Sequence, residues 1–594
     1  MNSRLKAAAA LVLAACVAGS SYASDATPPA KKTHRKAAPK GPSVDDQIQS
    51  LRQDLQNQIN ELKSDLASKD AQLKQAQQQA ADAQAAAARA QDAANTQQQA
   101  VTENQTAVNS LQSTVTDLKA NASSLAVTVS DENAKIKQQI TSPDAIYFKG
   151  ITLSPTGSFL AAETVWRQGA TGGDINTAFT GVPLDHADAA QLSEFQGTGR
   201  QSRLALKATG KLASATLTGY YEMDWLGTGI TSNNNQSNSY VLRMRQLWAD
   251  ARFTNGWDFS AGQGWSLATE TTKGLQRTSE ILPSVIDPQY TAGFVWTRQY
   301  GARVTKDFGN KFFVGISAEN AETLNPAGAN LPTNLLIGSP GVGGGLYNST
   351  ANYSFNLTPD FVAKLAVEPG WGHWEAFGIG RSFRDRIYPT AAGATPYNDT
   401  VWGGGIGGGF RGPLASKKVS IGLKGLWGQG VGRYGSSTIA DVTLRPDATI
   451  SPLHGFSALS TLEFTPTPRL TAYLNYGADY IGRNWAVDPA TGKKVGYGTY
   501  DVDMSGCNVE STTGGAFSPS TPSGCKANNK DVQEFTAGYS YNLYKGPKGT
   551  FRYGLQYALF RRDLWSGNGG TTNPGNGAKG TDNMFWTQVR YYLP

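Results

Sequence analysis

The chain has 594 residues, with 53 Lys or Arg against 46 Asp or Glu, so its formal net charge is +7. So small an excess over so long a chain is not the concentrated basic footprint of a nucleic-acid-binding protein. No aromatic residue lies between Tyr22 and Tyr147, whereas all 13 Trp and all 22 Phe follow Ile146. This boundary predicts two different kinds of structure.

Residues 1–23 are typical of an export signal. Arg4 and Lys6 precede an apolar stretch at 7–18, and a small-x-small cleavage site ends at Ala23. The stretch is shorter than the roughly 20 residues that a membrane-spanning helix needs. Residues 13–16 also resemble a lipobox, which leaves open the alternative that Cys16 becomes a lipid-bearing N-terminus.

Residues 24–42 form a linker with four Pro and five Lys or Arg. This composition cannot build a core, so the segment is expected to be disordered. It would act as a solubilising tether or, alternatively, contact an anionic cell-wall polymer through its charges.

Residues 43–142 contain neither Gly nor Pro, and their apolar residues repeat at 3-4 spacing. From Ile59 onward, 19 of 24 heptad core positions are apolar, which predicts a coiled coil. At about 1.5 Å per residue, its helix would be roughly 150 Å long. Pairs such as Val108 with Leu111 favour two strands. A helical hairpin that turns back in the Ala-rich middle is the alternative.

Residues 145–594 alternate apolar and polar side chains in short segments separated by Gly, Asn, Asp and Pro, which predicts β-strands. No stretch of about 18 apolar residues occurs, so a membrane-embedded form must be a closed barrel. Its length allows about 16 antiparallel strands, an even number as in bacterial barrels. The clearest segments are 203–208, 212–221, 240–253, 361–367, 419–427, 470–480, 551–560 and 585–593.

Alternation also assigns the charged residues of these strands to a face. A Lys or Arg that faces lipid at mid-membrane costs about 2–4 kcal/mol, so the cations should face the lumen. The expected pore-lining basic residues are Arg203, Lys207, Arg243, Arg245, Arg552 and Arg590.

Four of these cations come from two segments close in sequence and would form a basic stripe that lowers the barrier for small anions. Alternatively, they pair with lumenal carboxylates and only seal the wall. Residues 266–290 do not alternate and carry Glu270, Glu280 and Asp287. They form either a constriction loop folded inward opposite the stripe or a surface loop. The candidate acidic partners are Glu222, Asp224 and these three loop acids.

Two cysteines, Cys507 and Cys525, flank a stretch rich in Gly, Ser, Thr and Pro. In an exported protein they predict a disulfide that stiffens an exposed loop. No His lies near them, so we expect no metal site there. The chain has four His, and only His186 stands beside an acid, Asp185. We therefore expect no catalytic residues and no cofactor.

Three runs carry a family resemblance: QSRL at 201–204, LRMRQLWADARF at 242–253 and AGQGWS at 261–266. They resemble the DcaP-like outer-membrane porins, which also have an N-terminal helical extension. The resemblance implies a trimer of 16-stranded barrels that pass small anionic solutes such as dicarboxylates. Two features depart from the family: the chain ends in Leu593-Pro594 where a terminal Phe is usual, and the predicted coil is longer.

Together these patterns predict a porin of the bacterial outer membrane that lets small anionic solutes diffuse passively, with its coil in the periplasm. Its partners would be outer-membrane lipid and further copies of the chain. The family resemblance implies a trimer, whereas the core positions of the predicted coil favour a two-stranded coiled coil. A structural tether that links the outer membrane to the cell wall is the alternative function.

Overall fold

The computed structural model describes residues 145–227, 240–324, 326–338, 354–414, 416–510, 525–568 and 577–594, besides 48–49, 51–53, 55–56 and 78. The isolated N-terminal positions are helical and belong to one unit, Met1–Glu103. The barrel strands belong to a second unit, Asn104–Pro594. The predicted signal, the linker and most of the coil lie outside the described residues. No described helix is long and apolar enough to cross a membrane.

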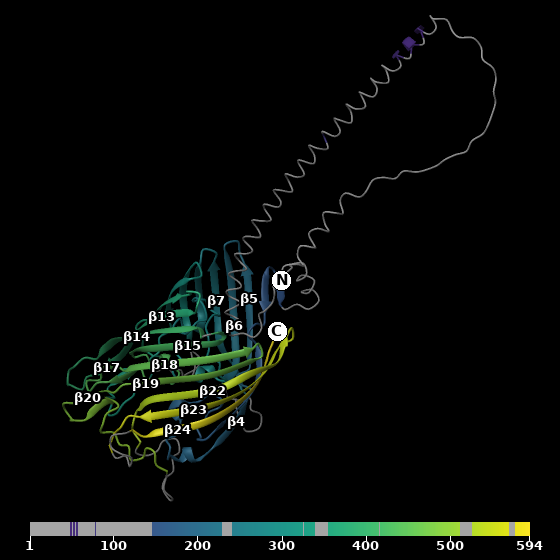
Figure 1. The fold of residues 1–594 in the computed structure, drawn as a ribbon. Helices are drawn as coiled ribbons and strands as arrows, with labels where there is room; N and C mark the ends of the chain where they lie inside the picture. The colour runs from purple at the N-terminus through teal and green to yellow at the C-terminus, as the bar shows by residue number, and fades with distance from the viewer. Residues whose placement is uncertain are drawn as a thin grey trace. The chain divides into compact units, whose positions relative to one another are not determined.

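The second unit is a closed antiparallel β-barrel (Figure 1). Within the described residues, sixteen strands form its wall when β4 and β5 are counted as two halves of one strand. The ring closes where Met584 to Tyr592 of the last strand pair with Arg167 to Phe159 of the first. The prediction of about 16 strands is confirmed.

The wall strands follow one another around the barrel in chain order. They are β3 (Phe159–Arg167), β4 (Glu194–Thr198) with β5 (Arg203–Lys211), β6 (Ala215–Gly227), β7 (Val241–Phe253), β8 (Trp257–Trp265), β9 (Arg298–Phe308), β10 (Phe312–Glu319), β12 (Asp360–Val367), β13 (His373–Ile387), β14 (Tyr397–Leu414), β15 (Ser416–Gln429), β18 (His454–Thr467), β19 (Leu470–Ile481), β22 (Asn529–Gly546), β23 (Gly549–Leu564) and β24 (Lys579–Tyr592).

Smaller elements decorate this ring. The hairpin of β1 (Ile146–Phe148) and β2 (Ile151–Ser154) precedes β3, and β2 extends the wall by pairing with β5. The other elements lie in connections: β11 (Leu335–Ile337), β16 (Val442–Leu444), β17 (Ile450–Pro452), β20 (Asn484–Val487), β21 (Lys494–Tyr497) and the 3-10 turns η1 (Phe179–Gly181), η2 (Asp188–Gln191), η3 (Pro288–Tyr290) and η4 (Gly432–Tyr434).

The connections are short at one end of the barrel, the turn end, and long at the other, the loop end. At the turn end, Gly309 and Asn310 have φ of 71° and 58°, the left-handed values that tight hairpins require. The loop end carries the segments 168–193, 266–297, 430–453, 482–510 and 525–528. Because β3 runs away from the turn end and β24 runs towards it, the barrel begins and finishes at the same end.

The two faces of the wall differ as the alternation predicts. Along β12, Asp360, Val362, Lys364 and Ala366 are buried inside, and the intervening apolar residues are exposed outside. An exposed apolar outer face is what a lipid-embedded barrel needs. Large aromatics gather on this face near the turn end, as in an interfacial girdle: Trp257, Phe308, Phe312, Trp374 and Phe410.

In the middle of β14, four alternate positions on the inner face, Gly403, Gly405, Gly407 and Gly409, carry no side chain. A Cβ at Gly403 would lie 2.8 Å from the Phe383 ring, and one at Gly407 would run into Phe377. The glycines therefore let bulky side chains of neighbouring strands lie across this part of the wall.

Candidate functional site

Residues 266–297, the connection between β8 and β9, run through the inside of the barrel, and we call them the constriction loop. Lys364 of β12 donates to the carbonyl of Thr269 at 2.7 Å. Farther along, Glu534 of β22 accepts from the Ala292 amide at 2.8 Å. Arg590 of β24 donates to the Ile286 carbonyl at 2.6 Å. A loop that reaches these distant strands lies in the lumen and not on the surface.

The constriction loop packs against one side of the inner wall. Three of its side chains, Leu267, Leu275 and Val295, join a buried apolar cluster on the inner wall. The barrel's contribution to that cluster comes from β10, β12, β13 and β15: Phe313, Val362, Ala366, Phe377, Ile379 and Leu426. Since burial of this apolar surface excludes water, solutes cannot pass on this side.

A buried group of charges clamps the first part of the loop to the same wall. Glu375 of β13 forms ion pairs with Lys364, at 2.7 Å, and with Lys424 of β15. It also accepts from the Thr271 amide of the loop at 3.2 Å. His373 places one ring nitrogen 3.1 Å from Glu375 and the other 2.7 Å from Glu368. We call Lys364, Glu368, His373, Glu375 and Lys424 the clamp.

The opposite inner wall, on β5, β6 and β7, carries the predicted basic stripe. Arg203 and Arg245 pair with Glu222 at 3.5 and 2.8 Å. Arg245 and Arg243 pair with Asp224 at 2.7 and 2.9 Å. Three of the four cations predicted for the stripe therefore lie together, and two of the carboxylates named as candidate partners, Glu222 and Asp224, pair with them.

This pairing leaves the group positively charged. Arg298 of β9 lies close enough to Arg243 and Arg245 to repel them electrostatically. Its guanidinium lies over the rings of Trp265 and Trp296. Four arginines thus face two carboxylates. Side-chain nitrogens of Arg203, Arg245 and Arg298 are buried without a hydrogen-bond partner among the described residues. We call these six charged residues the basic wall.

The basic wall remains in contact with solvent. The Arg243 side chain is 39% exposed and that of Arg203 is 22% exposed. In contrast, Lys364 and Lys424 on the filled side are 0% and 2% exposed. At these positions the lumen is drier beside β10 to β15, which we call the dry half, than beside β5 to β7, where Arg203 and Arg243 reach solvent and Arg245, at 3%, is itself buried.

Of the other predicted pore-lining cations, Arg590 and Arg552 point inward and have partners. Arg590 pairs with Glu163 of β3, with Nε 2.7 Å from the carboxylate. Arg552 donates to Asn542 at 3.0 Å and to the Tyr592 hydroxyl at 3.3 Å. Lys207 is half-buried on β5.

The three predicted loop acids do not lie together opposite the basic stripe. Glu270 pairs with Arg411 of β14 at 2.7 Å, and Glu280 pairs with Arg303 of β9 at 3.3 Å. Asp287 accepts from Asn176 at 2.7 Å. Burial raises the pKa of Asp287 to about 7, because its charged form is poorly solvated there. The acids mainly anchor the loop.

Sequence reasoning missed the clamp, although a signal for it was present. Lys364 is the one cation of the segment 361–367, and alternation already assigned such residues to the lumen. What the sequence did not reveal is that Lys364, Glu375 and Lys424, from three strands, meet beneath the constriction loop.

A disulfide joins Cys507 to Cys525 in the long connection between β19 and β22. Cys507 is buried and packs with Val502, Met504 and Leu184, the last from the connection after β3. The disulfide thus closes one long connection on itself, and the packing of Cys507 with Leu184 joins that connection to the one after β3.

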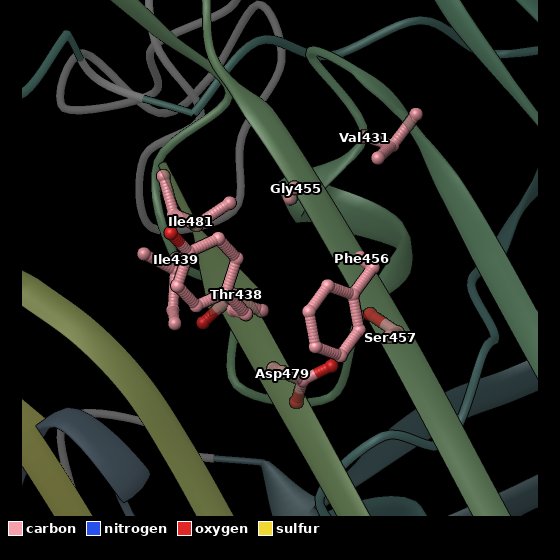
Figure 2. A pocket seen from close by; sticks show the side chains of 10 residues that line it. Val431, Thr438, Ile439, Gly455, Phe456, Ser457, Asp479 and Ile481 are labelled. Carbon is pink, nitrogen blue, oxygen red and sulfur yellow. The ribbon is translucent and has the colours of Figure 1, made fainter. Parts of the chain in front are cut away.

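Two hollows of the described structure lie away from the basic wall. One cavity of about 10 Å³ lies where residues 431–439 pack on β18 and β19, with Ser457 and Asp479 at its edge (Figure 2). It holds at most one water molecule. A larger hollow, about 700 Å³, lies between outward apolar side chains such as Leu474, Leu555 and Phe585, where lipid would cover it.

Among the described residues, no three His, Cys, Asp or Glu side chains gather closely enough to hold a metal ion between them.

No protein-family model and no curated protein match the chain. Several solved structures are similar to it. The outer membrane channel DcaP of Acinetobacter baumannii is 15% identical over 76% of this chain and 99% of that chain, with a TM-score of 0.49. OprB of Pseudomonas putida is 11% identical over 77% and 96%, with a TM-score of 0.41. An anion-selective porin from Comamonas acidovorans is 11% identical over 75% and 99%, with a TM-score of 0.36.

Proposed function

We propose that the chain is an outer-membrane porin through which small hydrophilic solutes, anions in preference to cations, diffuse passively. The observation that carries this proposal is the division of the lumen. A folded-in loop closes one side, and the side left in contact with solvent carries the basic wall, with two positive charges in excess. An excess cationic charge lowers the energy of an anion that sheds part of its hydration shell.

The rest of the architecture is part of the same proposal. Copies of the chain would form a trimer in the outer membrane, as the resemblance to DcaP-like porins implies. The coil predicted at 43–142 would extend into the periplasm, where the linker meets the cell wall. A structural tether remains the alternative function, since such a coil also fits a spacer.

Planar-bilayer recordings in a KCl gradient test the proposal. The parent protein should conduct, with a reversal potential displaced towards that of chloride. Arg243→Gln removes half of the charge excess from a partly exposed position, so it should lower the anion preference several-fold at low salt. Lys493→Gln is the matched control, because it removes the same charge from an exposed turn at the loop end.

Conduction without ion preference in the parent protein would refute the anion preference but retain the porin. A folded, reconstituted protein that never conducts would refute the porin and leave the tether.

A further inference from the structure

Two carboxylates face each other inside the loop end of the barrel. Asp385 of β13 and Asp399 of β14 are direct cross-strand partners. A third acid, Asp447, on the turn between β16 and β17, is near enough to act electrostatically on Asp385. Like charges directly opposite each other destabilise a sheet, so this arrangement requires compensation.

The compensation near Asp385 is limited to two backbone amides, its own and that of Asp399. The Asp385 side chain is 2% exposed, and neither carboxylate oxygen accepts a hydrogen bond of good geometry. A buried carboxylate normally either has an ionic partner or coordinates a metal ion.

The arginines close in sequence to Asp385 and Asp399 bond elsewhere, and Arg445 lies near enough to Asp447 to act on it electrostatically. Arg384 donates to the Phe355 carbonyl at 2.9 Å, and Arg386 donates to the Asn398 side chain at 2.9 Å. Arg445 donates to the Ile450 carbonyl at 2.9 Å. The protein's own described cations therefore leave Asp385 without a counter-charge.

The two other acids are partly engaged and keep oxygens available. Asp399 accepts one hydrogen bond, from the Ile450 amide at 2.9 Å, through Oδ2. Asp447 uses Oδ1 for both the amide and the hydroxyl of Thr449, at 3.0 and 2.6 Å. Oδ1 of Asp399 and Oδ2 of Asp447 remain as further acceptors.

We propose that Asp385 and Asp399 bind a divalent cation, Ca²⁺ or Mg²⁺, at the loop end of the barrel, with water completing its coordination and Asp447 adding negative charge. Hard cations of this kind prefer oxygen ligands, and a site with two carboxylates and several waters is sufficient for them. The bound ion would join β13 and β14 to the hairpin of β16 and β17, and so stiffen the mouth of the barrel. This site is independent of solute conduction.

Thermal unfolding of the full chain in detergent, with EDTA or with CaCl₂ or MgCl₂ added alone, tests the site. The parent Tm should rise with the metal, with half of the effect at about 10⁻⁴–10⁻³ M if the affinity is that of extracellular Ca²⁺ modules. Calorimetric titration should show one ion bound per chain.

Asp385→Asn and Asp399→Asn should each remove the metal response. In EDTA each should also have a Tm above that of the parent, because one of two opposed charges is gone. Asp488→Asn is the matched control: it removes a carboxylate from an exposed turn, and its metal response should equal that of the parent.

Two results would overturn the proposal. A parent protein whose Tm is the same in EDTA and in either metal has no such site, and its acids share a proton instead. A metal response that persists in both Asn variants places the ion elsewhere. If one variant does not fold, the other carries the test.

Discussion

Glu375→Gln is expected to destabilise the barrel strongly, although it removes no more than one charge and keeps the size of the side chain. In the parent, the Glu375 carboxylate is the ionic partner of both Lys364 and Lys424, and it also accepts from the Thr271 amide. The variant leaves two lysines inside the dry half of the lumen, each with a backbone carbonyl and no carboxylate partner.

The size of the effect follows from the burial of the lysines. Their side chains are 0% and 2% exposed, so water cannot replace the lost carboxylate without opening the loop. Removal of one partner from a buried ion pair typically costs about 3–5 kcal/mol. This corresponds to a roughly 10²- to 10⁴-fold change in the equilibrium between folded and unfolded protein.

Guanidinium unfolding in detergent, followed by tryptophan fluorescence, measures this change. Glu510→Gln is the control, because Glu510 is exposed, and its effect should be within about 0.5 kcal/mol. In bilayers, the channel of the Glu375→Gln variant should also be noisier, since the first part of the constriction loop loses its anchor.

Adding Lys424→Met to Glu375→Gln supplies a second test of the same reasoning. The double variant buries one unpaired lysine fewer, so it should be more stable than Glu375→Gln alone. A loss below about 1 kcal/mol for Glu375→Gln would contradict the premise that buried charge pairing holds the loop.

Two further changes probe the barrel interior. Gly407→Ala should destabilise by about 1–3 kcal/mol because its methyl group meets the Phe377 ring, whereas Gly380→Ala, with no atom within 4 Å, should be neutral; equal Tm values for the two would contradict this packing. The pKa of Asp287, raised to about 7, predicts that the contribution of this residue to stability is fully present below about pH 4 and falls by up to about 4 kcal/mol as pH rises through 7, since the folded state prefers the neutral acid. Asp287→Asn should flatten this dependence. The unfolding midpoint is measured at pH 5 and at pH 8 for both proteins, and an equal change in the parent and in the variant would contradict the reasoning.

The strands and their faces could be predicted because both depend on local properties. A period of two places Arg203, Arg243 and Arg590 on one face, and the cost of a charge in lipid decides that this face is the inner one. The observed strands extend the predicted segments by a few residues, as for Gly549–Leu564 against the predicted 551–560. The start of the predicted segment 212–221 was wrong: Leu212 lies in a turn, and β6 begins at Ala215.

The partners of the charged residues could not be predicted with the same certainty. Glu270 and Glu280 were candidate partners of the basic stripe. Each pairs instead with an arginine outside the stripe, Glu270 with Arg411 and Glu280 with Arg303. The path of the constriction loop decides this, and the sequence left open whether the loop folds inward. The clamp was missed for the same reason.

The sequence by itself thus determined the barrel, its inward cations and the segment that fails to alternate, because hydrophobic period and desolvation act on each strand separately. Ring closure decided the rest. Only when β24 pairs with β3 do β12, β13 and β15 come to face β5 to β7 across one lumen. The constriction loop then divides that space. As a result, Lys364 is buried in the clamp and Arg243 stays partly exposed to solvent.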